Sequence, residues 1–158
     1  MNFREAFSKW GLSRISLNLK FAELEFSPTD DDGIAAWEMY VELVTRITTQ
    51  KLLDDSGDEG TALESVYKIF AITRDILKTH GRKSGAFTKI AIIVLNQVIR
   101  PFTAKWHKRS IDGTLTKPEG KICFRRELEA LQVDLRNYSR MLAEMAKVED
   151  LTYIAIEE

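Results

Sequence analysis

The chain has 158 residues, 44% of them hydrophobic and 30% charged, a composition typical of one globular domain large enough to bury a core. Eight glycines and three prolines are too few for a disordered or fibrous chain, and a single cysteine excludes an intramolecular disulfide. The net charge of −1 conceals a segregation that bears on partners: residues 66–126 carry 14 Lys and Arg against 3 Asp and Glu, whereas the other 97 residues carry 9 against 21.

The first residues predict a short helix over 2–10. Phe3, Phe7 and Trp10 follow intervals of four and three, which places them on one helical face. Asn2 and Glu5 are spaced as a capping pair, and a glycine follows the segment as a stop signal.

Residues 15–26 are interpreted as a half-buried strand, since Ile15, Leu17, Leu19 and Phe21 alternate with polar residues. Helical spacing fits part of the same segment. The apolar tail at 151–156 is the available internal partner for such a strand. If the two do not pair, the strand is free to add to the sheet of another chain in a strand-mediated complex.

The remainder predicts a mainly α fold, a four-helix bundle at 29–158 that follows an N-terminal extension at 1–28. The acidic run 30–32 marks the start of a helix to about residue 53, and Thr61 with Glu64 forms a capping box for a second helix that ends at Gly81. The third helix, 86–99, is apolar on nearly all sides. The clearest helix is the last, in which apolar residues keep a 4-3 spacing: Phe124, Leu128, Leu131, Leu135, Tyr138, Leu142 and Met145.

The basic middle of the chain is the candidate contact surface for nucleic acid, RNA ahead of DNA, or for an acidic protein. Clustered Lys and Arg bind phosphates because each neutralised phosphate releases a counterion, and an interleaved Trp can stack on a base. The candidate residues are Arg82, Lys83, Arg100, Lys105, Trp106, Lys108, Arg109, Lys117, Lys121, Arg125 and Arg126. The same patch could instead meet acidic segments of the protein itself, including those of another copy in a homo-oligomer.

Within this stretch, Arg100 and His107 lie seven positions apart, with six residues between them, in the run RPFTAKWH. If one helix carries both, they share a face about 10.5 Å apart along the axis. An imidazole can move protons while a guanidinium stabilises phosphate charge. The pair resembles the Arg–x(4–6)–His motif of HEPN ribonucleases. That resemblance implies a small helical bundle that cleaves RNA without metal, in a site assembled across a dimer, as in toxin or antiviral-defence proteins.

Other chemistry has little support in the sequence. Two His and one Cys without paired spacing do not form a zinc motif, and neither a Gly-rich phosphate loop nor a Gly-x-Ser-x-Gly motif occurs, so we expect no metal and no cofactor. The longest apolar run, Ile90 to Leu95, is far shorter than the roughly 20 residues of a membrane span. We therefore expect a cytoplasmic, non-catalytic binding or assembly module, with the ribonuclease as the alternative.

Overall fold

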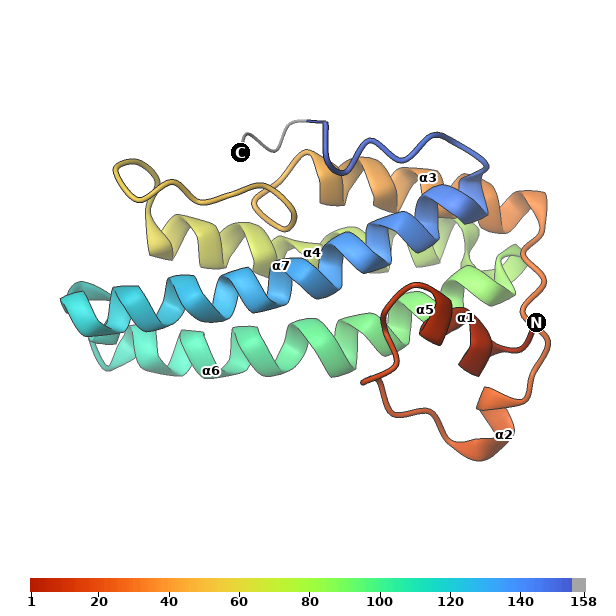
Figure 1. Ribbon diagram of the computed structural model, residues 1–158, viewed down its shortest axis with the longest axis horizontal. Helices are drawn as coiled ribbons and strands as arrows, with labels where there is room; N and C mark the ends of the chain where they lie inside the picture. Colours follow the sequence, from red (N-terminus) through yellow and green to blue (C-terminus); the bar gives the residue numbers. More distant parts are fainter. Residues whose placement is uncertain (155–158) are drawn as a thin grey trace.

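Four long helical segments lie side by side and form the body of the molecule (Figure 1). The computed structural model describes residues 1–154. Its long segments are α3 (Asp30–Val44), α4 (Glu59–His80), the pair α5 (Gly85–Val94) and α6 (Arg100–Ile111), and α7 (Pro118–Ala146). The mainly α bundle is confirmed. None of the helices within the described residues combines the length and apolarity that crossing a membrane requires.

The core of the bundle is built on α7, whose 4-3 seam is confirmed: all seven of its residues are at most 5% exposed. Helix α3 makes the most extensive contact with α7. On the third long segment, Phe87 and Ile90 are fully buried but Ile92 is 43% exposed. That helix therefore lies at the side of the bundle rather than at its centre.

The expected helix near the N-terminus is present as α1 (Phe3–Lys9). Asn2 Oδ1 accepts a hydrogen bond from Glu5 N at 2.9 Å, and Glu5 Oε2 accepts one from Asn2 N at 2.8 Å, so the capping pair is also confirmed. The buried rings of Phe3 and Phe7 join the main core. The first residues thus belong to the same packed body as the bundle.

The predicted strand at 15–26 is wrong. A short helix, α2 (Leu19–Ala22), begins there because Asn18 Oδ1 accepts a hydrogen bond from Phe21 N at 2.8 Å, and this cap selects the helical alternative. The end of the segment pairs only with the first residues of the chain, through an isolated bridge between Asn2 and Glu25.

The tail does not supply the expected partner strand. Residues 151–154 instead lie against α3, where Tyr40 Oη accepts a hydrogen bond from Leu151 N at 2.5 Å and Thr152 is fully buried. Residues 155 and 156 of the predicted tail strand lie outside the described residues. A strand-mediated complex therefore has no strand to use within residues 1–154.

Two helix boundaries differ from the predicted ones because side chains cap the backbone. Helix α3 ends at Val44 rather than near 53, since the hydroxyls of Thr48 and Thr49 donate to Leu43 O at 2.6 and 2.9 Å. Helix α4 begins at Glu59, with Asp58 rather than Thr61 as its N-cap. It ends before Gly81, as predicted.

The chain stays helical through Pro101. A π-helical segment, Leu95–Ile99, lies between α5 and α6, and Pro101 falls in the first turn of α6, where a missing N–H is tolerated. Arg100 and His107 therefore belong to one uninterrupted helix.

Candidate nucleic-acid interface

Helices α4 and α6 run antiparallel and bring Arg100 and His107 to one surface. The guanidinium carbon of Arg100 lies 4.8 Å from the centre of the Phe70 ring, and the His107 ring packs edge-on against Tyr67 with centres 4.8 Å apart. The shared face that the sequence predicted is therefore present, directed towards α4. The rise between the two positions is about 10.5 Å.

A second arginine, Arg74 on α4, joins Arg100 at this surface. Its guanidinium carbon lies 5.9 Å from the centre of the same Phe70 ring. Arg100 Nε donates to Asn96 Oδ1 at 3.0 Å, which orients its guanidinium. Among residues 1–154, neither arginine has a carboxylate within ion-pair distance. Both charges are thus available to an anion.

Tyr67 provides an exposed aromatic ring beside these cations. Its side chain is 48% exposed, and its only close aromatic neighbours among the described residues are Phe70 and His107. The imidazole of His107 is 35% exposed and places Nε2 3.7 Å from Glu64 Oε1. We call the surface formed by Tyr67, Arg74, Arg100 and His107 the α4–α6 face.

The structure removes Trp106 from the candidate contact residues. Its side chain is fully buried, and Nε1 donates to Glu127 Oε2 at 2.6 Å. The same carboxylate pairs with Lys105, and the Arg109 guanidinium lies 5.2 Å from the Trp106 ring centre. Trp106 is a core residue that cannot stack on a base. Lys105 forms an ion pair with Glu127 of the same chain.

Arg125 also has an internal role. Its Nε donates to Glu59 Oε1 at 2.9 Å, and its Nη1 donates to the carbonyls of Leu52 and Leu53 at 3.2 and 2.8 Å. Only 18% of its side chain is exposed. It ties α7 to the start of α4 and to the loop before it, and little of it faces solvent.

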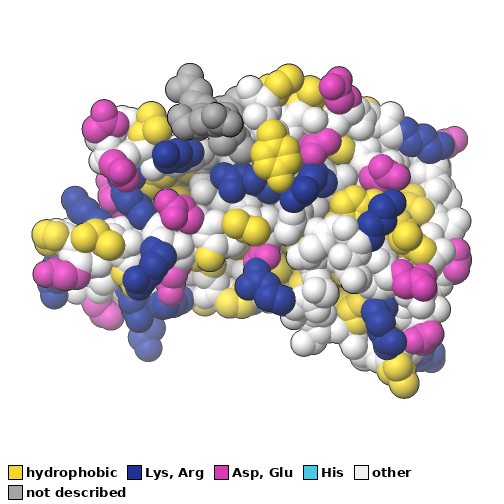
Figure 2. All heavy atoms as spheres, in the orientation of Figure 1, with side chains coloured by type: hydrophobic (Ala, Val, Ile, Leu, Met, Phe, Trp, Pro, Cys, Tyr) yellow, Lys and Arg dark blue, Asp and Glu magenta, His cyan; other side chains and the backbone are white. Residues whose placement is uncertain are grey.

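The remaining basic candidates lie at the two ends of the molecule. Arg82 and Lys83 form the turn between α4 and α5, whereas Lys108, in the last turn of α6, lies with Lys117, Lys121 and Arg126 where α6 meets α7. The 27 residues from Gly85 to Ile111 separate these ends by about 40 Å. On the side that carries α7, Lys and Arg are mixed with acidic side chains (Figure 2). The basic stretch is therefore not one continuous patch.

Tyr67 and Arg74 are not among the contact residues predicted from the sequence. Both are separated from Phe70 by about one turn of α4, three residues before it and four after it. Lys78, four residues beyond Arg74, falls on the same side of the helix by the same period. The sequence shows that these four residues share one side of α4. Only the packing of α4 against α6 shows that this side faces Arg100.

No protein-family model, curated protein or solved structure matches this chain significantly. Within residues 1–154, no group of three or more His, Cys, Asp or Glu side chains is placed to hold a metal ion. The function is therefore inferred from the geometry of the α4–α6 face.

Proposed function

We propose that this protein is a non-catalytic module that binds single-stranded RNA on the α4–α6 face. The observation that carries the proposal is the pair of guanidiniums, Arg74 and Arg100, held over Phe70 without a carboxylate partner among the described residues and beside the exposed ring of Tyr67. Arginine binds phosphate through charge-assisted hydrogen bonds, and an exposed aromatic ring can stack on an unpaired base.

The salt dependence of RNA affinity tests the arginines. For labelled single-stranded RNA, each phosphate contact contributes about 0.7 to the slope of log affinity against log salt. Arg74→Gln and Arg100→Gln should each weaken binding and reduce this slope by about that amount. Lys20→Gln, an exposed lysine in α2, is the matched control and should leave the slope unchanged. Equal slopes for all these variants would refute the proposal.

Tyr67→Leu tests the stacking contact separately. A stacked base is worth about 1–3 kcal/mol, so this variant should bind about 5- to 150-fold more weakly with an unchanged salt slope. Circular dichroism would confirm that it is folded. If poly-glutamate binds the face and RNA does not, the partner is an acidic protein.

A metal-independent ribonuclease is the second candidate, because α6 is continuous and presents Arg100 and His107 on the same face. His107 would serve as the general acid or base, and Arg100 would stabilise charge on the scissile phosphate. Incubation of RNA with a chelator, followed by a denaturing gel, tests this. Cleavage that is lost in His107→Ala would replace the non-catalytic proposal, whereas intact RNA in a bound complex would support it.

A further inference from the structure

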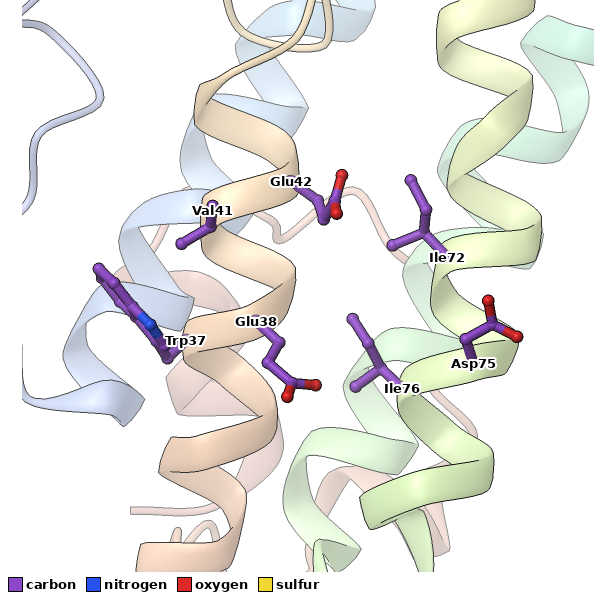
Figure 3. Close-up of a pocket in the computed structure, with 7 residues that line it drawn as sticks. All are labelled: Trp37, Glu38, Val41, Glu42, Ile72, Asp75 and Ile76. Atoms are coloured by element: carbon purple, nitrogen blue, oxygen red, sulfur yellow. The ribbon is translucent and has the colours of Figure 1, made fainter.

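A groove of about 390 Å³ lies between α3 and α4 (Figure 3). By the helical period, its α4 residues Ile72 and Ile76 are on the other side of that helix from Arg74. Its floor is apolar, formed mainly by Ile72 and by Ile76, which is 6% exposed. Three carboxylates line it: Glu38 and Glu42 project from α3 towards α4, and Asp75 lies on α4. The groove therefore combines an apolar floor with an acidic rim.

The acidic rim is only partly neutralised by the protein itself. Glu42 pairs with Arg46 at 2.9 Å, and Glu38 Oε2 lies 3.1 Å from His80 Nε2. Asp75 has no cation within ion-pair distance among residues 1–154. The groove thus keeps a net negative charge and is complementary to a surface that is both cationic and apolar.

Apolar side chains also remain exposed on α3 beside the groove. Ile34, Trp37 and Val41 follow one face of α3 at intervals of three and four residues, and they are 51%, 46% and 37% exposed. Of the three, Trp37 and Val41 line the groove. A single exposed apolar residue needs no explanation, but a stripe beside a groove is typical of an interaction surface.

A complementary surface exists at the other end of the same chain. Where α6 meets α7, Ile111 is 86% exposed and Ile122 is 68% exposed. Lys117, Lys121 and Arg126 surround Ile122 in the sequence, and no carboxylate among residues 1–154 forms an ion pair with any of them. Figure 2 shows exposed hydrophobic side chains at this end, with Lys and Arg side chains and some acidic side chains near them.

We infer that the α6–α7 end of one copy docks into the α3–α4 groove of a second copy. Opposite charges would guide the approach, and the exposed isoleucines would cover the apolar floor. The contact cannot form within one chain, because the two surfaces are too far apart. The α6–α7 end adjoins the start of α4, whereas Ile72 in the groove lies 13 residues, or about 20 Å, further along that helix. The end projects beyond the first turn of α4 and is accessible to another molecule (Figure 1).

Because each copy carries both surfaces at different places, the contact joins copies head to tail. Sedimentation velocity over a range of protein concentrations should therefore show reversible self-association that weakens between about 50 and 200 mM salt. A groove variant (Glu38→Lys with Asp75→Lys) and an end variant (Lys121→Glu with Arg126→Glu) should each weaken it by about tenfold or more, because like charges then face each other. All four sites lie outside the protein interior, so both variants should fold, and Lys20→Glu is the control.

Mixing the two variants provides the decisive test. The reversed groove of one variant then faces the reversed end of the other, and the unchanged end of the first faces the unchanged groove of the second. Both contacts pair opposite charges, so the mixture should associate more strongly than either variant alone. Ile122→Ser should weaken association without any change in charge. A wild-type protein that remains monomeric at low salt would overturn the inference, as would a mixture that does not associate. None of these substitutions lies on the α4–α6 face, so RNA binding and self-association can fail independently.

Discussion

Replacing Arg125 with methionine should destabilise the fold severely, although Arg125 belongs to a run of basic residues that resembles a binding patch. The side chain joins Glu59 at the start of α4 and two carbonyls of the preceding loop. Methionine retains most of the aliphatic volume but has no donor. The variant would leave the Glu59 carboxylate, whose side chain is 8% exposed, without its cation.

Breaking a buried ion pair from one side costs about 3–5 kcal/mol, because the remaining charge stays desolvated. Since 18% of the Arg125 side chain is exposed, water can partly solvate the remaining carboxylate, and we expect a loss near the lower bound, about 3 kcal/mol. Adding Glu59→Gln removes the unpaired charge. The double variant should therefore recover part of the loss, giving a coupling energy of about 2 kcal/mol between the two residues.

Urea denaturation followed by circular dichroism measures these losses. The neighbouring residue is the matched control. Arg126 is exposed, and its one side-chain hydrogen bond among the described residues is a long one, from Nη2 to Cys123 Sγ at 3.8 Å. Arg126→Met should change the free energy of unfolding by less than about 0.5 kcal/mol. Equal losses for the two variants, or additive effects in the Glu59 double variant, would show that Arg125 does not hold α4 and α7 together.

Two other substitutions test the interior. The hydroxyl of Tyr138 is buried and has no hydrogen-bond partner among the described residues, so Tyr138→Phe should be neutral or stabilising by up to about 1 kcal/mol in urea denaturation at pH 7. Burial raises the pKa of the Tyr138 hydroxyl in the folded protein. Above about pH 10 the hydroxyl therefore ionises in the unfolded chain but not in the folded one, and this residue should lower the free energy of unfolding by about 1.4 kcal/mol per pH unit. Tyr138→Phe should make that decrease with pH less steep. Gly120→Ala would place a Cβ 1.9 Å from Thr114 O and should cost about 1–3 kcal/mol in thermal denaturation, whereas Gly85→Ala, with Lys89 Nζ at 3.6 Å, should have little effect.

The parts of the fold that were predictable depend on periodicity sustained over many residues. The seam of α7 recurs over three heptads, so local exceptions do not change its interpretation, and the structure buries every member. The segment 15–26 is too short for its alternation to outweigh a local cap. Asn18 decides in favour of a helical turn there, and the threonines after α3 end that helix early by the same kind of side-chain bond.

The candidate site was predictable in part, because the sequence gives residue types but not their partners. Arg100 and His107 are on the predicted common face, since a single helix determines that relation. The roles of Trp106 and Arg125 depend on Glu127 and Glu59, which come from other segments, 21 and 66 residues away. Hydrophobic or basic character alone cannot distinguish a residue that faces solvent from one that such a partner holds in the interior.

Helix α4 explains how the two proposed surfaces remain distinct within so small a domain. Arg74 and Asp75 are adjacent in the sequence, and one residue of an α-helix turns the side chain by about 100°. Arg74 consequently joins Tyr67 beside α6, while Asp75 joins Ile72 and Ile76 beside α3. The helix thus presents a basic, aromatic side and an acidic, apolar side. Basic and acidic side chains are therefore segregated across this one helix as well as along the sequence. For this reason residues 66–126 do not form a single basic patch.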